Sequence, residues 1–193
     1  GAGAGGRVSE AAGDRLLTLR PATGADAVAL AHFVNAAYRG ESSKAGWTTE
    51  ADLLGGQRVD AAGLRALIGT PGNVVLLHEP AGVILACVAL EKRGDDCYLG
   101  MLTVSPVHQA AGIGRGVLQA AEQYAREHFA ATRMTMTVIA QRTELIAWYE
   151  RRGWRRTGRF EPFPYGDERF GLPRRPDLRF EVLEKRVDGR CGP

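Results

Sequence analysis

Cysteine is scarce in this sequence, and the cysteines present form no metal-binding or disulfide pattern. There are three, Cys87, Cys97 and Cys191, an odd number without metal-ligand spacing. This usage is typical of a reducing compartment, so we expect Cys87 and Cys97 to be strand residues rather than reagents. The four histidines also lack the mutual spacing of metal ligands, and we predict no metal site.

The sequence also lacks a long hydrophobic run. The longest one, residues 83–90, has eight residues and is far too short to cross a bilayer. The opening GAGAGGRVSEAAGD contains no apolar stretch that resembles a signal peptide. We therefore expect a soluble, cytoplasmic protein with no membrane partner.

There is little excess of charge of either sign. The net charge of +3 is too small to indicate nucleic-acid binding by itself. One basic cluster stands out, and its members are Arg151, Arg152, Arg155, Arg156 and Arg159. No aromatic platform accompanies these arginines, so we interpret them as a solvated helix end and edge strand and predict no nucleic-acid partner.

The size and composition are those of one ordinary globular domain. With 193 residues, 45% hydrophobic and 24% charged, the chain is long enough to bury a hydrophobic core without disulfide bonds or a structural metal ion. We expect residues 1–14 to be a flexible N-terminal extension, residues 15–187 a single domain, and residues 188–193 a C-terminal tail.

In the first half of the chain, helical periodicity gives way to strands. We expect a strand at residues 16–20, halted by Pro21, and then a helix containing Leu30 and Val34. A second helical region is expected from residue 47 to 54, continuing to Ile68. Three strand-like segments follow at residues 74–78, 82–90 and 97–104. Their short connections predict antiparallel hairpins.

The second half alternates helices and strands. A helix is expected after Gly112, a strand at residues 134–139, and a helix at residues 144–152 that ends at Gly153. The last strands are expected at residues 154–157 and 178–184, with a loop over residues 160–177 between them. Because a helix connects two strands after Gly112, the order predicts an α/β fold with a mixed sheet.

Three glycines, Gly112, Gly114 and Gly116, stand where a strand gives way to a helix. Such a turn directs several backbone N–H groups to one point, where a phosphate fits, although a tight turn that binds nothing has the same pattern. A Rossmann site does not fit, because Val117 replaces the next expected glycine and the preceding strands form a meander. No Gly-Lys-Ser/Thr follows, so a Walker A loop does not fit either.

Two motifs resemble the GNAT N-acetyltransferases. Residues 109–114, QAAGIG, match the family's Gln/Arg-x-x-Gly-x-Gly/Ala motif, and residues 148–154, WYERRGW, are similar to its Tyr-x-x-x-Gly-Phe signature. The resemblance implies a mixed, mostly antiparallel sheet of about six to seven strands, splayed at the centre and flanked by about four helices. It also implies acetyl-CoA as the cofactor, with acetyl transfer to a primary amine by direct attack in a ternary complex.

The resemblance implies a role for each of several residues. Tyr149 would protonate the departing thiolate, and the Leu102 N–H would polarise the thioester carbonyl. The cofactor-binding residues that the resemblance implies are Leu102, Thr103, Val104, Gln109, Ala110, Ala111, Gly112, Ile113, Gly114, Arg115, Arg142 and Tyr149. Gly100 would keep space open near the acetyl group.

The sequence departs from the family at two places. Many relatives carry a glutamate that accepts the amine proton where this chain has Tyr98, a poor base at neutral pH. We expect Tyr98 to order a water at most, with Glu91 as a substitute by proximity in sequence. Arg142 stands where relatives often carry asparagine, so the usual contact to pantetheine is not implied.

The acceptor is expected between two loops, and its candidate contacts are Tyr38, Trp47, Glu50 and Tyr165. Small-molecule and peptide amines stay open, as does a homodimer. Two other functions also stay open: a non-catalytic acyl-CoA-binding regulator on the same fold and, far behind, a nucleotide-cofactor oxidoreductase.

Overall fold

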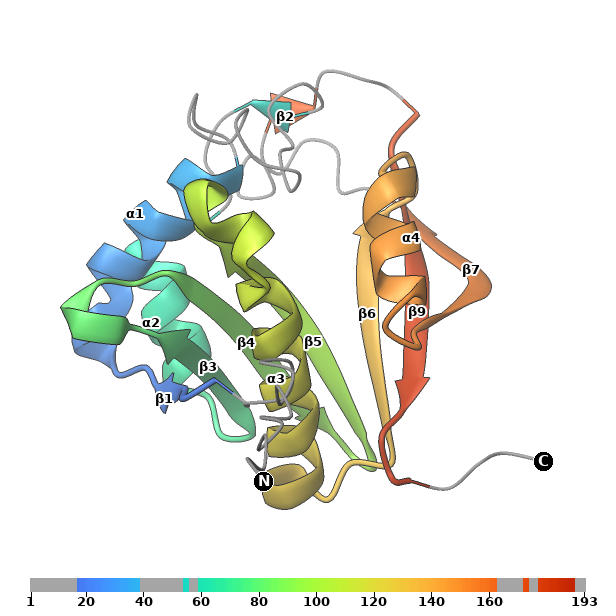
Figure 1. Cartoon of the computed structure of the whole chain (residues 1–193), viewed down its shortest axis with the longest axis horizontal. Helices are drawn as coiled ribbons and strands as arrows, with labels where there is room; N and C mark the ends of the chain where they lie inside the picture. The colour runs from blue at the N-terminus through green and yellow to red at the C-terminus, as the bar shows by residue number, and fades with distance from the viewer. Residues whose placement is uncertain (1–16, 39–53, 56–58, 163–171, 174–176, 190–193) are drawn as a thin grey trace, which may run out of the picture.

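A computed structural model describes residues 17–38, 54–55, 59–162, 172–173 and 177–189, and the structural statements below concern these residues. Figure 1 shows the fold from the front. The α-helices in the described residues are α1 (Ala27–Tyr38), α2 (Ala61–Gly69), α3 (Ile113–Phe129) and α4 (Thr143–Glu150). Each of the four overlaps a segment where the sequence predicts a helix.

The main sheet has seven strands in the order β1-β3-β4-β5-β6-β9-β7. They are β1 (Arg20–Pro21), β3 (Asn73–His78), β4 (Ala86–Arg93), β5 (Asp96–Val104), β6 (Arg133–Ile139), β7 (Arg155–Pro162) and β9 (Arg179–Arg186). Every neighbouring pair is antiparallel except β5 and β6, which α3 connects as a crossover. The predicted mixed, mostly antiparallel sheet is confirmed.

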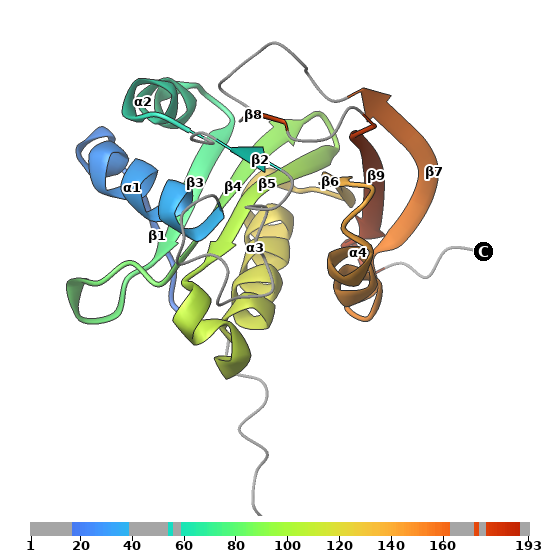
Figure 2. The same cartoon turned by 90° about the horizontal axis from the view of Figure 1, so that it is seen from above.

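The helices form two layers around this sheet. Figure 2 shows α1 and α2 on one side and α3 and α4 on the other. The buried side chains follow the same division, because one core cluster joins α1 and α2 to β3–β5 and a larger one joins α3 and α4 mainly to β4, β5, β6 and β9. Cys87 lies in the first cluster and Cys97 in the second. Burial raises the pKa of the Cys97 thiol to about 12, so this cysteine is a neutral core residue, as predicted.

The sheet divides at its only parallel pair among the described strands. Strands β5 and β6 pair at three positions, ending at Tyr98 opposite Thr135. Beyond that point β5 continues with β4 and β6 continues with β9, and the two strands diverge (Figure 1). This is the predicted splay at the centre of the sheet.

A β-bulge shapes β5 inside the splayed region. Ala89 pairs with Gly100 and Cys87 with Thr103, so two residues of β5 stand opposite Val88. Met101, in the bulge, has φ 56°, a left-handed conformation that is rare for a residue with a side chain. Bulges bend a strand and redirect the residues that follow, here Leu102.

Four expected boundaries are wrong. Strand β4 is Ala86–Arg93 rather than residues 82–90, because a 3-10 helix, η3 (Pro80–Gly82), takes up the start of that segment. The first strand is Arg20–Pro21 rather than residues 16–20, and Pro21 pairs with Leu76 because an edge strand does not need its missing N–H. Leu54 and Gly55 form β2 (Leu54–Gly55), which pairs with β8 (Leu172–Pro173), instead of lying inside the expected second helical region. Strand β7 continues to Pro162, through residues expected to be loop, because β9 pairs with it on both sides of a register shift. The rest of the expected helix before Leu54 lies outside the described residues.

None of the helices in the described part of the chain is long and apolar enough to cross a membrane.

Candidate active site

The glycine turn leads from the end of β5 into α3. A short 3-10 helix, η4 (Pro106–Ala111), precedes Gly112, whose φ of 78° requires the left-handed conformation that glycine adopts without strain. None of the described residues has an atom within 4 Å of the position that a Cβ on Gly112 would occupy. The first N–H groups of α3 have no partner within the helix and point out of its start. The turn therefore offers an open, anion-favouring cradle.

The other two glycines let the start of α3 approach its neighbours. A Cβ on Gly114 would lie 3.5 Å from Val104 Cγ2 and 3.7 Å from Trp148 Cζ2. A Cβ on Gly116 would lie 2.8 Å from Leu17 Cγ, closer than real contacts allow. Gly114 thus brings the turn against β5 and α4, whereas Gly116 serves packing against the segment before β1. The side chains of Gln109, Ala110 and Ala111 lie outside the described residues.

The strand residues expected to face the cofactor are buried. Leu102 is 6% exposed, and Thr103 and Val104 are also buried. The Thr103 hydroxyl donates to the carbonyl of Met101 at 3.0 Å, which fixes the bulge. The side chains of Leu102 and Val104 join the main core, so any chemistry at these positions comes from the backbone.

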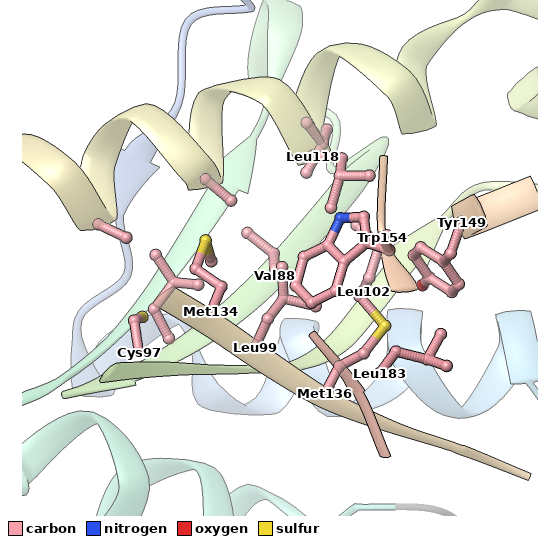
Figure 3. Close-up of a cluster of buried hydrophobic side chains, with 14 of the residues drawn as sticks. Val88, Cys97, Leu99, Leu102, Leu118, Met134, Met136, Tyr149, Trp154 and Leu183 are labelled. Carbon is pink, nitrogen blue, oxygen red and sulfur yellow. The ribbon is translucent and has the colours of Figure 1, made fainter. Parts of the chain in front are cut away.

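Tyr149 projects from α4 into the same core cluster as Leu102. It is 5% exposed and makes edge contacts with Trp148 and Trp154, with ring centroids 5.2 and 6.2 Å apart. Figure 3 shows Tyr149, Trp154 and Leu102 gathered at one end of this cluster. Two segments separated by the splay, β5 and α4, therefore bring the two predicted catalytic residues into one cluster.

Tyr98 takes part in a hydroxyl bridge that the sequence did not reveal. Its hydroxyl lies 2.8 Å from Thr137 Oγ1, so side chains join β5 and β6 just beyond their last backbone pair. Its ring covers Gly100, whose Cβ would lie 3.3 Å from Tyr98 Cε1. The space beside Gly100 is thus filled by this ring and not left open. The alternation of Thr135 and Thr137 on β6 is the only sequence signal for the bridge.

Glu91 lies opposite Tyr98 on β4 but is already paired. Arg93 donates to both of its carboxylate oxygens at 3.3 Å, and the Arg93 guanidinium lies 4.2 Å from the centroid of the Tyr98 ring. The Arg93 side chain therefore packs against the face of the Tyr98 ring. It also places a positive charge next to Glu91, the only carboxylate proposed as a base.

Of Arg142 and the predicted acceptor contacts, only Arg142 is described with its side chain. Arg142 is 8% exposed and precedes α4, where its backbone accepts from Ile146 at 3.1 Å. Tyr38 ends α1, but its side chain, like the whole of Trp47, Glu50 and Tyr165, lies outside the described residues. No group of three or more His, Cys, Asp or Glu side chains in the described ranges is arranged to hold a metal ion.

A buried ion pair holds the end of α4 against α3. Lys185 Nζ lies 2.6 Å from Glu122 Oε1 and donates to the carbonyl of Arg152 at 2.8 Å. Burial raises the pKa of Glu122, and Lys185 opposes that shift. The pair joins α3, β9 and the turn after α4, and so fixes the helix that carries Tyr149.

The arginine cluster divides into two groups. Arg155 and Arg156 on β7 pair with Glu184 and Glu181 of β9. They line an open groove of about 420 Å³, whose other arginines are Arg133 and Arg159. Arg151 and Arg152 lie instead at the end of α4. The expected edge strand is correct for the first group, because β7 is last in the sheet order.

A family model supports the class that this geometry defines. The model described as the acetyltransferase (GNAT) family matches residues 32–154, which include the splayed strands, the glycine turn and Tyr149. The chain belongs to the GNAT acetyltransferase family. Acetyl-CoA is the acetyl donor of this family.

Solved structures share the fold at low sequence identity. The protein yncA of Salmonella typhimurium, solved with its cofactor acetyl-CoA, has 21% identity and a TM-score of 0.63, over 92% of this chain and 97% of its own. The ribosomal-protein-S18-alanine N-acetyltransferase of Escherichia coli has 14% identity and a TM-score of 0.65, over 91% and 96%. A chimaeric spermidine N-acetyltransferase from Vibrio cholerae has 15% identity and a TM-score of 0.63, over 90% of this chain and 96% of its own. No curated protein sequence matches the chain.

Proposed function

We propose that this protein transfers the acetyl group of acetyl-CoA to a primary amine by direct attack in a ternary complex. The observation that carries the proposal is the divergence of β5 from β6 after Tyr98, directly beside a glycine turn that starts α3. A thioester arm lying along β5 would have its diphosphate at the turn and its acyl end near Leu102 and Tyr149.

The residues of the turn fit the diphosphate of CoA. Among the described residues, Gly112 leaves open space where a side chain would stand, and the N–H groups of Ile113, Gly114 and Arg115 belong to the first turn of a 17-residue helix, where no backbone carbonyl of the helix itself accepts them. The positive end of the helix dipole favours the same anion.

Acetyl-CoA, when bound, supplies an activated acetyl group with a thiolate as its leaving group. The Leu102 N–H, directed by the bulge at Met101, would donate to the carbonyl oxygen as negative charge develops on it. Such a fixed donor contributes about 10²–10³-fold in rate. The Tyr149 hydroxyl is protonated at neutral pH and would give its proton to the departing sulfur.

The proton of the amine needs an acceptor, and this chain offers no unpaired carboxylate among the described groups around Tyr98. Glu91 is engaged by Arg93, and Tyr98 is bonded to Thr137. We propose that the Tyr98–Thr137 pair orders a water, which accepts the proton and passes it to solvent. Glu91 would make only a secondary contribution to accepting the amine proton.

The first test is release of thiol from acetyl-CoA with a panel of amines. We include spermidine and a peptide with an N-terminal alanine, because fold relatives at low identity carry those specificities in their names. We expect turnover above the enzyme-free rate with at least one amine. Tight binding of acetyl-CoA with no turnover for any small or peptide amine would favour the non-catalytic acyl-CoA-binding role instead.

A second prediction concerns the hydroxyl bridge. Tyr98→Phe and Thr137→Val each remove one hydroxyl and should lower kcat by about three- to tenfold, as expected for loss of an ordered water rather than of a base. Thr135→Val, two positions away on the same face of β6, is the matched control and should have no effect. If Glu91→Gln abolished turnover while substrate binding stayed intact, Glu91 would be the direct base and the water route would be wrong.

A further inference from the structure

Three arginines gather where α3 begins and α4 ends. Arg152 lies over the Trp148 ring, with its guanidinium carbon 4.3 Å from the ring centroid, and its Nη1 donates to the Trp148 carbonyl at 3.2 Å. The same indole contacts the glycine turn, 3.7 Å from the position of a Cβ on Gly114. Arg115 is the next residue of α3, and Arg151 precedes Arg152. Trp148 therefore stands between the turn and a second, cationic position.

The charge of Arg152 is not compensated by a carboxylate, unlike that of several other arginines in the described chain. Arg20, Arg133 and Arg156 each bond to a carboxylate that raises the pKa of the guanidinium. The pKa of Arg152 is lowered, first by burial and then by repulsion from Arg151 and Arg115. Within the described residues, its buried Nε has no hydrogen-bond partner. A buried donor amid like charges is unfavourable unless an anion binds there.

We propose that Arg115, Arg151 and Arg152 bind the 3′-phosphate of CoA, apart from the diphosphate at the glycine turn. This rests on the proposed function, because it takes CoA as the ligand. CoA carries phosphate at two separate places on its nucleotide, and the chain offers two separate anion-favouring positions on either side of Trp148. A phosphate monoester carries between one and two negative charges at neutral pH, and the planar fork of arginine suits its oxygens.

The consequence is selectivity between CoA and dephospho-CoA, which differ only in this phosphate. Calorimetric titration of the wild-type protein should give an affinity for CoA at least tenfold higher than for dephospho-CoA. Arg152→Gln should lower the affinity for CoA by about tenfold and leave that for dephospho-CoA unchanged. Arg126→Gln, on an exposed arginine in the last turn of α3, is the matched control for net charge and should preserve the selectivity.

The outcomes separate this inference from the function on which it rests. If neither ligand bound, the proposed acetyl-CoA site itself would fail. Equal affinities of the wild-type protein for the two ligands would overturn the 3′-phosphate assignment alone, and this comparison needs no variant to fold. An Arg152→Gln variant that lost affinity for both ligands equally would show a structural role. Displacement of CoA by a short RNA but not by adenosine 3′,5′-bisphosphate would assign the arginines to nucleic acid and also overturn the proposal.

Discussion

Replacing Tyr149 by phenylalanine is expected to lower kcat by about 10²–10⁴-fold, with little change in acetyl-CoA affinity or melting temperature. The substitution keeps the ring, and the ring makes the edge contacts with Trp148 and Trp154 that hold it in the core. Only the hydroxyl is lost, so the effect on rate isolates its role as an acid. Without it, the sulfur would leave as an anion in a site that is partly closed to water.

The measurement must be made where chemistry limits the rate. Pre-steady-state thiol release with a saturating amine meets this condition, and the pH profile adds a second readout. If Tyr149 is the acid, its loss should remove the decline of kcat on the alkaline side that deprotonation of a phenol produces. Tyr124→Phe is the matched control, because that ring stacks on His128 with centroids 4.0 Å apart, on the part of α3 far from the turn. A Tyr149→Phe variant with near-normal single-turnover rates would exclude the hydroxyl as the acid.

Much of this architecture was predictable from the sequence, because it depends on local patterns. The short connections between residues 74 and 104 indicated antiparallel hairpins, and β3, β4 and β5 are antiparallel neighbours. The glycines after β5 marked the start of α3, and Gly153, with φ 90°, ends the segment that carries Tyr149. In each case one or two residue types set the backbone conformation.

Other features depend on contacts between distant residues, and the sequence reveals them poorly. The bulge at Met101 sets the direction of β5 in the splay, and the only hint of it is the preceding Gly100, a residue type that often marks bulges in strands. The Tyr98–Thr137 bridge joins residues 39 positions apart. The pairing of Arg93 with Glu91 changes the chemistry of a carboxylate that the sequence alone offered as a base.

The arginines illustrate the same point for function. In the sequence, Arg151 to Arg159 form one basic cluster, with a solvated surface as the simplest interpretation. In the fold, Arg155 and Arg156 on β7 neutralise buried or half-buried carboxylates of β9, whereas Arg152 lies beside Trp148, and burial and neighbouring cations lower its pKa. Charge in a sequence is informative only after the partners of each side chain are known.

The other large effect is expected for Gly114→Glu, which should weaken CoA binding more than a hundredfold in a protein that stays folded. A Cβ at this position meets Val104 and Trp148 at ordinary contact distances of 3.5–3.8 Å, so the backbone can accept it. Apolar atoms line that side, so the new carboxylate has to turn toward the start of α3, where the diphosphate would lie. Like charges placed together at an interface cost several kcal/mol.

The controls separate charge, size and stability. Gly114→Ala adds only the tolerated Cβ and should retain most of the affinity. Gly69→Glu adds the same charge at the end of α2, where no described residue lies within 4 Å of the added Cβ, and should bind CoA normally. Gly116→Ala would bring its Cβ within 2.8 Å of Leu17 Cγ, so it should lower the melting temperature more than the affinity of the folded protein.

The choice of donor gives the decisive comparison for Gly114→Glu. S-acetylpantetheine carries the reactive thioester but no phosphate, so a carboxylate at the glycine turn has no anion to repel. The variant should therefore lose far more activity with acetyl-CoA than with S-acetylpantetheine, relative to wild type. Equal losses with both donors would mean that the substitution distorts β5 or α4. Unchanged CoA affinity in the folded variant would mean that the diphosphate does not bind at this turn, because the new carboxylate would repel an anion bound there.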